Sequence, residues 1–317
     1  MTDVHASFSV GPSPLTRPML EGEVKPKGLD LDIREFKSMD DNSRRMLDLE
    51  FDIAEMSIAT YSKAREQNIP LIALPLFTSG RRFMHTSIHL STRSGIKDLS
   101  ELRGRTVGAS QYWMSSSIWQ RQVLHQVYGL APEDVAWTTV NKERMAELRI
   151  PAGVKHHLES EGRSVRDLAA AGEIDAAMAV SGPKPEGQPD PLVPAFPDRE
   201  AAQREYYQRT GIFPIVHITV LKRELADREP TIIDSLFAAY LAAKKLAESR
   251  LGSESGGSGH GDDNPDATVR ALGGDPWAYG IAANRKPLEA FVATAYDQGL
   301  VARQFSVDDL FARDLPA

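Results

Sequence analysis

The chain has 317 residues, 41% of them hydrophobic, which is enough for one large or two ordinary domains with packed cores. Its formal net charge of −7 provides no basic surface for nucleic acid or an anionic membrane, so we expect a small molecule as its partner. Cysteine is absent, which excludes disulfides and thiolate metal sites and fits a cytoplasmic protein.

The first part of the chain alternates strands with helices. Apolar or alternating patterns predict strands over 6–10, 29–36, 51–57 and 71–77. Helical patterns lie between them, over 15–20, 43–49 and 58–67. This βαβαβ order predicts a mainly parallel sheet with helices on its faces.

A second α/β unit follows. Its predicted strands are 105–109, 135–140 and one that leads to Val180. Helices are expected over 117–128, before Gly172, and over 200–209, 231–250 and 287–298. The Pro-rich segment 181–198 is expected to wrap the surface, and the composition of 251–267 predicts a flexible linker.

Two extended apolar stretches carry histidine, and we interpret both as crossings between lobes. The stretch 210–220 reads TGIFPIVHITV and contains His217, while Pro214 places its first half at an edge or a hinge. The stretch 81–92 reads RRFMHTSIHLST and contains His85. A working site is therefore expected in the cleft beside the crossings.

Two α/β lobes joined by two crossings have the layout of the type II periplasmic-binding-protein fold, in which mixed sheets carry helices on both faces. The predicted lobe I comprises 1–87 and 217–317, including the linker 251–267, and lobe II comprises 88–216. In such sheets ligands bind beyond the carboxyl ends of strands, so residues at strand ends are the functional candidates.

Five stretches in this order resemble one enzyme family, the 4,5-dihydroxyphthalate decarboxylases, which are similar to solute-binding proteins of ABC transporters. They read LDLEFDIAEMS (47–57), RRFMHTSIHL (81–90), DLSELRGRTVGAS (98–110), YYQRTGIFPIVHITV (206–220) and YGIAANRKPLEAF (279–291). The correspondence is weak over 141–200 and 251–267. Met84 stands where the family pattern leads us to expect arginine, which bears on substrate identity more than on reaction type.

The resemblance implies decarboxylation of a hydroxylated aromatic dicarboxylic acid, a reaction that a protein can perform without a cofactor, and the scattered carboxylates of the sequence predict no metal site. The ring carbon that bears the departing carboxylate must gain a proton while a hydroxyl supplies electron density. Arginine suits the binding of carboxylate, because its planar fork makes two hydrogen bonds. Histidine suits proton transfer, because its pKa lies near the working pH.

Three residues are the catalytic candidates. His217 comes first, and its alternative role is a core histidine bonded to a backbone carbonyl. His85 comes second; in an extended chain it would stand about 13 Å from His89, too far for both to bind one metal ion. Glu55 could accept a phenol proton, or could simply be a solvated charge at a strand end.

The candidates for substrate binding share positive charge, hydroxyl groups or an aromatic ring, and they are Arg81, Arg82, Ser57, Arg17, Tyr112, Ser115, Ser116 and Phe213. The two adjacent arginines could instead be plain surface charge. Ser57 could instead be only a helix N-cap. Ser115 and Ser116 could form an anion site at a helix start, with Tyr112 and Trp113 as stacking walls.

The sequence leaves other functions open or unsupported. No P-loop, G-x-G-x-x-G, G-x-S-x-G elbow or cysteine nucleophile is present, so nucleotide, hydrolase and zinc readings lack support. The main rival is a solute-binding protein that delivers an aromatic or other small organic acid to an ABC transporter. A different lyase or dehydratase on the same scaffold, and a homo-oligomer, also stay open.

The N-terminal segment 1–14 shows no secretory signal, and no apolar run is long enough to span a bilayer.

Overall fold

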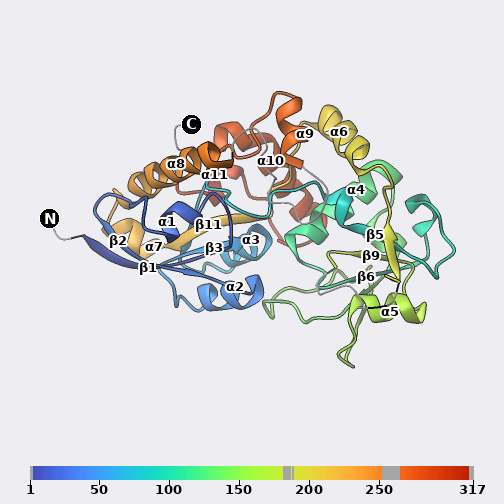
Figure 1. The fold of residues 1–317 in the computed structure, drawn as a ribbon. Helices are drawn as coiled ribbons and strands as arrows, with labels where there is room; N and C mark the ends of the chain where they lie inside the picture. The colour runs from blue at the N-terminus through green and yellow to red at the C-terminus, as the bar shows by residue number, and fades with distance from the viewer. Residues whose placement is uncertain (1–2, 181–186, 188, 252–264, 314–317) are drawn as a thin grey trace. The chain divides into compact units, whose positions relative to one another are not determined.

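The computed structural model describes residues 3–180, 187, 189–251 and 265–313 (Figure 1). The chain divides into two compact units. Unit 1 comprises 1–82, 207–293 and 303–317, and unit 2 comprises 83–206 and 294–302.

These bounds differ from the predicted lobes 1–87 with 217–317, and 88–216. The chain changes unit four times rather than twice, because 294–302 belongs to unit 2. The reason is visible at Gln298, whose side chain accepts a hydrogen bond from Arg121 at 2.7 Å and donates one to the Ile118 carbonyl at 3.1 Å. Most of the predicted linker 251–267 lies outside the described residues, and 265–267 begin a helix, α9 (Pro265–Ala271).

Unit 1 contains a five-stranded mixed sheet in the order β2-β1-β3-β11-β4. Its strands are β1 (Val4–Val10), β2 (Leu29–Glu35), β3 (Ile53–Ser57), β4 (Leu71–Leu74) and β11 (His217–Lys222). The first three run parallel, whereas β11 runs antiparallel to both β3 and β4. The predicted mixed α/β sheet is confirmed here.

Alternation along β1 explains how helices cover both faces of this sheet. Phe8 points to one face, where it packs in the core with Leu236 and Tyr240 of α8 (Ile232–Leu251). Ser9 points to the other face, where its hydroxyl bonds Asn42 of α2 (Met39–Leu47) at 2.6 Å. Figure 1 shows these two helices on either side of the strands.

The other helices of unit 1 follow the strands in the chain or close the unit. They are α1 (Arg17–Leu20), α3 (Ile58–Glu66), α7 (Arg223–Arg228), α9, α10 (Ile281–Asp297), which ends in unit 2, and α11 (Val307–Leu310). Among the described residues, none of the helices combines the length and apolarity that a membrane span requires.

Unit 2 contains a six-stranded mixed sheet in the order β10-β5-β9-β6-β7-β8. Its strands are β5 (Ile88–Ser91), β6 (Thr106–Ala109), β7 (Ala136–Thr139), β8 (Lys155–Leu158), β9 (Ala176–Met178) and β10 (Leu192–Pro194). Its helices include α4 (Ser115–Tyr128), α5 (Val165–Ala171) and most of α6 (Arg199–Thr210). The strand β8 is exposed and polar, which explains why no apolar pattern predicted it.

Two predicted strands are wrong in extent. The stretch 210–220 is helical up to Thr210, and β11 begins only at His217. Pro214 lacks an N–H group and Gly211 has φ +61°, so the residues between cannot form a ladder. The stretch 81–92 is not extended throughout, because 84–87 form a 3₁₀ turn, η1 (Met84–Ser87), before β5.

Candidate active site

The strongest polar cluster of unit 1 lies at the carboxyl end of β3. The antiparallel pairing of β3 with β11 sets Thr219 opposite Glu55 and His217 opposite Ser57. Glu55 and His217 are therefore diagonal neighbours on one face of the sheet. Their side chains meet, with His217 Nδ1 3.0 Å from Glu55 Oε1.

The Glu55 carboxylate is only 1% exposed, yet it is well supplied with hydrogen-bond donors. The Gly11 N–H donates to Oε2 at 3.1 Å, and the Thr78 hydroxyl donates to the same oxygen at 3.4 Å. The Ser79 hydroxyl donates to Oε1, which also faces His217. The alternative of a solvated strand-end charge is wrong, because the carboxylate is buried.

These donors decide the charge of Glu55. Burial alone would raise the pKa of the carboxyl, but the hydrogen bond and charge of His217, together with Ser79 and Gly11, outweigh burial and lower the pKa of Glu55. The group is therefore an ionised carboxylate at neutral pH, and an ionised carboxylate can only accept hydrogen bonds.

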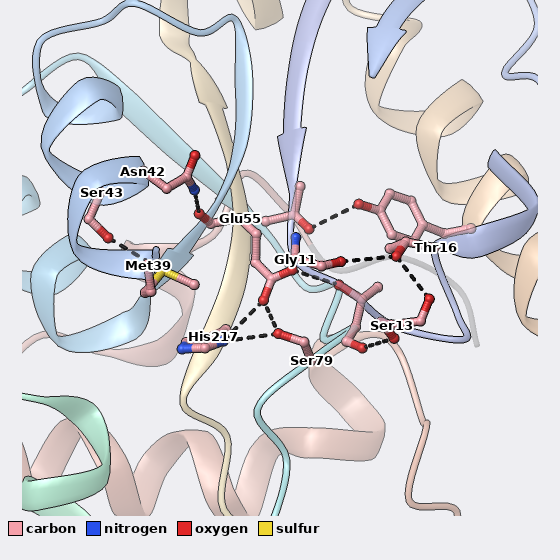
Figure 2. A network of polar contacts seen from close by, with 12 residues as sticks. Gly11, Ser13, Thr16, Met39, Asn42, Ser43, Glu55, Ser79 and His217 are labelled. Atoms are coloured by element: carbon pink, nitrogen blue, oxygen red, sulfur yellow. Dashed lines mark hydrogen bonds and ion pairs between the residues drawn. The ribbon is translucent and has the colours of Figure 1, made fainter. Parts of the chain in front are cut away.

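Two loops hold this arrangement in place (Figure 2). The loop after β1 approaches the turn after β4, because the Ser13 hydroxyl donates to the Thr78 carbonyl at 2.5 Å. Thr16 ties the same loop to itself by donating to the Gly11 carbonyl at 3.2 Å. From the other side, the Asn42 amide donates to the Glu55 carbonyl at 2.6 Å.

The geometry separates this site from a hydrolase triad. Ser79 Oγ lies 3.0 Å from His217 Nδ1, the same ring nitrogen that faces Glu55. In a hydrolase triad the serine nucleophile and the orienting carboxylate meet opposite nitrogens of the imidazole. Ser79 is therefore not placed to be activated as a nucleophile by His217.

The second ring nitrogen of His217 points away from the Glu55 carboxylate, as Figure 2 shows. The side chain is 24% exposed, so part of the ring is accessible to solvent. A histidine held by a carboxylate at one nitrogen can exchange a proton at the other. The arrangement thus differs from a core histidine bonded to a backbone carbonyl, because the partner of His217 is a carboxylate.

Gly80 makes room for the histidine. It has φ +72°, and a Cβ there would lie 2.4 Å from Val216 Cγ2 and 2.8 Å from His217 Nδ1. The substitution Gly80→Ala combines a strained backbone with a collision at the imidazole. Only glycine fits at this position without displacing the ring.

We expect Gly80→Ala to lower the free energy of unfolding by about 2–4 kcal/mol and to displace His217. Gly28→Ala is the matched control, since Gly28 has φ +74° but nothing within 4 Å of the added Cβ. Urea unfolding of both variants measures the difference, and equal losses would show that backbone strain, not the contact with His217, limits this position.

Arg81 is a buried cation near the cluster, 6% exposed. Its guanidinium donates to the Ala278 carbonyl at 3.3 Å and the Phe213 carbonyl at 3.5 Å, and lies 5.0 Å from the centroid of the Phe213 ring. Burial lowers the pKa of Arg81 to about 10, partly opposed by Asp275, so the side chain stays charged at neutral pH.

A small pocket joins Arg81 to the proton-transfer cluster, since Ser79 lines it as well. Its water-accessible volume is about 10 Å³, room for roughly one water molecule or one carboxylate oxygen. The residues around it are Ser13, Pro14, Leu15, Phe77, Thr78, Ser79, Arg81 and Trp277. Of the predicted binding residues, Arg81 and Phe213 thus lie together with Glu55 and His217 in unit 1.

The other predicted residues of unit 1 have simpler surroundings. The Ser57 hydroxyl caps α3 by accepting from the Thr60 N–H at 3.5 Å. Arg17 is exposed and pairs with Glu35 at 3.3 Å, and its role at an anion site stays a prediction. Burial lowers the pKa of Arg82, the last residue of unit 1 before the chain enters unit 2.

The predicted residues of unit 2 are mostly packed in its interior. The ring of His85 lies edge-on to Phe196 at 5.0 Å and to Tyr206 at 4.9 Å. Tyr112 is fully buried and the Arg121 guanidinium covers its ring at 3.8 Å, so the predicted stacking wall is wrong. Large aromatic surface is most stable inside a core, and here it forms one.

Ser115 and Ser116 stand where the sequence placed them, in the first turn of α4. Both are buried, at 3% and 4% exposure, and the residue before the helix provides no side-chain cap. Within the described residues, no three His, Asp or Glu side chains gather in a way that could hold a metal ion.

Sequence reasoning missed Gly11, Ser79, Gly80 and Asn42. Two signals could have found the first three. The segments GPSP (11–14) and TSG (78–80) directly follow predicted parallel strands, and ligands and functional side chains gather beyond the carboxyl ends of such strands. Asn42 gave no such signal, because its role depends on how α2 packs on β3.

The chain is similar to two groups of known proteins. A sequence model of a family of ABC-transporter periplasmic substrate-binding proteins for phosphonate matches residues 19–180. A 4,5-dihydroxyphthalate decarboxylase of Comamonas testosteroni is 30% identical over 98% of this chain and 97% of its own length. The chain belongs to the 4,5-dihydroxyphthalate decarboxylase family.

Another member of the decarboxylase family, the 4,5-dihydroxyphthalate decarboxylase of Pseudomonas putida, is 29% identical over 66% of this chain and 83% of its own length. The predicted resemblance is confirmed, and it makes the chain a relative of carboxy-lyases as well as of binding proteins. Among solved structures, the periplasmic aliphatic sulphonate binding protein SsuA of Escherichia coli matches with a TM-score of 0.57, 13% identity and 98% coverage of both chains. That likeness confirms the predicted periplasmic-binding-protein fold.

Proposed function

We propose that this protein decarboxylates a hydroxylated aromatic dicarboxylic acid such as 4,5-dihydroxyphthalate without a cofactor. The observation that carries the proposal is the Glu55–His217 pair, in which a buried carboxylate holds one imidazole nitrogen and leaves the other facing outward. The names of the two curated relatives support the same chemistry. A solute-binding protein would need no such pair.

The reaction follows from proton transfer at His217. Nε2–H of protonated His217 donates its proton to the ring carbon that bears the departing carboxylate, while the hydroxyl para to that carbon supplies electron density. The bond to the carboxylate then breaks, its electron pair restores the aromatic ring, and CO2 leaves. One proton is consumed per turnover, and neutral His217 recovers it from solvent.

Glu55 and Arg81 have separate electrostatic roles in this proposal. The Glu55 carboxylate stabilises the imidazolium that must exist before proton transfer. Arg81 holds a substrate carboxylate, because it is a buried cation that pairs with carbonyl groups and with none of the carboxylates of the described residues within 4 Å. Ser79 lines the pocket together with Arg81 and donates to the Glu55 carboxylate.

The proposal is tested by incubating the protein with 4,5-dihydroxyphthalate and measuring CO2 and 3,4-dihydroxybenzoate. A panel of hydroxylated benzoates and phthalates under the same conditions defines which ring substituents are required. Turnover of at least one member supports the enzyme. Tight binding by calorimetry with no CO2 from any member would favour the solute-binding protein instead.

We expect Arg81→Met to raise KM for the dicarboxylate by about 10–100-fold, because a charge-assisted pair with carboxylate is lost. Arg34→Met is the matched control, since it removes an exposed arginine of the same unit that pairs with Asp32. Thermal unfolding of both variants separates lost binding from lost folding. An unchanged KM in a folded Arg81→Met protein would remove Arg81 from the binding site.

A further inference from the structure

The Ser79 hydroxyl occupies an unusual position, because it touches both members of the proton-transfer pair. It donates to Glu55 Oε1 and lies 3.0 Å from His217 Nδ1. The three polar groups therefore form a closed triangle, whose third side is the 3.0 Å contact between His217 and Glu55. A serine that only capped a turn would have no reason to contact either group.

The donors and acceptors of the triangle require a hydrogen on Nδ1 of His217. An ionised Glu55 can only accept, so the single hydroxyl hydrogen of Ser79 is used on Oε1. The lone pairs of Ser79 then face Nδ1, as do those of Oε1. An unprotonated Nδ1 would face two other acceptors, Ser79 Oγ and Glu55 Oε1, each at 3.0 Å. A protonated Nδ1–H can instead donate a hydrogen bond that the two oxygens share.

The neighbours of Glu55 show that no other group can take over this role. Gly11 and Thr78 both donate to Oε2, the carboxylate oxygen away from the imidazole. Only Ser79 and His217 meet Oε1 among the hydrogen bonds of the described residues. Without the hydroxyl, a single contact at the diagonal of two strands would orient the ring.

The turn that carries Ser79 is built to hold it. On one side of Ser79, the Thr78 carbonyl is held by the Ser13 hydroxyl at 2.5 Å. On the other side, Gly80 adopts φ +72° and lets the chain pass against His217 without a Cβ between them. The backbone therefore fixes the hydroxyl in place before any ligand binds.

We propose that Ser79 is a positioning residue: it shares the Nδ1–H of His217 with Glu55 and so holds the ring in one orientation, with Nε2 as the nitrogen that exchanges protons. The consequence for catalysis rests on the proposed function, whereas the orientation of the ring does not. Ser79 acts through the imidazole and forms no bond to the substrate. The hydroxyl thus keeps the Nε2 edge of the ring in one direction, from which it can donate a proton to an aromatic acid.

The test compares wild type with Ser79→Ala, Ser79→Thr and Ser62→Ala. Ser62→Ala is the matched control, because it also removes a buried hydroxyl of unit 1, one that donates to the Ile58 carbonyl at 2.8 Å. Long-range ¹H–¹⁵N spectra report the tautomer of each histidine, and the His217 signals are assigned as those that disappear in His217→Asn. The chain has eight histidines, so this assignment is practical.

In wild type and Ser62→Ala we expect one set of His217 signals, with the Nδ1–H tautomer when the ring is neutral. In Ser79→Ala we expect more than one set of His217 signals, because Glu55 alone then orients the ring, with kcat lowered about 10–100-fold and KM within about threefold. Ser79→Thr, which keeps the hydroxyl, is expected to restore the single set of signals and most of kcat. If Ser79→Ala does not fold, Ser79→Cys replaces it, since a thiol is a weak donor of similar size.

Two results would overturn the inference. One is an Nε2–H tautomer in the wild-type protein, and the other is a single, unchanged set of His217 signals in Ser79→Ala. Because the spectra need no turnover, they decide the role of Ser79 even if no substrate of the panel releases CO2. Failure of the proposed function and failure of this inference are therefore separate outcomes.

Discussion

His217→Asn is expected to lower kcat for CO2 release by about 10²–10⁴-fold, the range that a positioned general acid contributes. Asparagine can still bond to Glu55 but cannot carry a transferable proton. Folding should survive, because the ring lies at the start of β11 and is 24% exposed. KM should change little, since the imidazole acts on the reacting carbon rather than on the carboxylate.

The measurement is steady-state CO2 release, with calorimetry to show that the variant still binds the dicarboxylate. His5→Asn is the matched control, because His5 also faces a carboxylate, that of Asp30 at 3.2 Å, but on the exposed surface of unit 1. His85→Asn in the same assay decides between the two histidines that the sequence nominated. Full activity in His217→Asn would remove the proposed acid.

The sequence predicted the parts of the fold that depend on periodic patterns. Strands such as β1 and β3 are apolar or alternate cleanly, and each is followed by a helix, so the α/β order could be deduced. Irregular backbone was harder to predict. Pro214 lies in a run of apolar residues typical of a strand, and the missing N–H overrode that pattern.

The candidate site was predictable to the extent that it depends on strand ends. Glu55 and His217 were nominated separately, but the sequence could not show that two strands far apart in the chain become antiparallel neighbours. Tyr112 was predicted to line the site but is buried in the core, because an aromatic residue beside a helix start is compatible with either position. Whether such a residue lies in the site or in the core depends on long-range packing, which cannot be deduced from composition.

Glu55→Gln is expected to lower the free energy of unfolding by about 2–4 kcal/mol and kcat by about 10²-fold or more. Glutamine has nearly the same shape, but its amide nitrogen is a donor. Four donors converge on the carboxylate, from Gly11, Thr78, Ser79 and His217. An amide N–H would face at least one of them in a site that is 1% exposed to water.

The pH dependence of this loss has a definite sign. Because the folded protein lowers the pKa of Glu55 below its ordinary value of 4.5, the carboxylate contributes stability above that pH. The contribution is lost as the pH falls through the lowered folded pKa. Urea unfolding should therefore show the largest difference between wild type and Glu55→Gln near neutral pH, and a shrinking difference below 4.5.

Glu50→Gln is the matched control for Glu55→Gln, since Glu50 pairs with Arg45 at 2.7 Å but is 47% exposed. Exposed ion pairs contribute little, so this variant should unfold within about 0.5 kcal/mol of wild type at every pH. A pH-independent loss in Glu55→Gln would mean that shape, not charge, stabilises the site. In that case an ionised Glu55 could not be the group that holds the imidazolium of His217 for proton transfer.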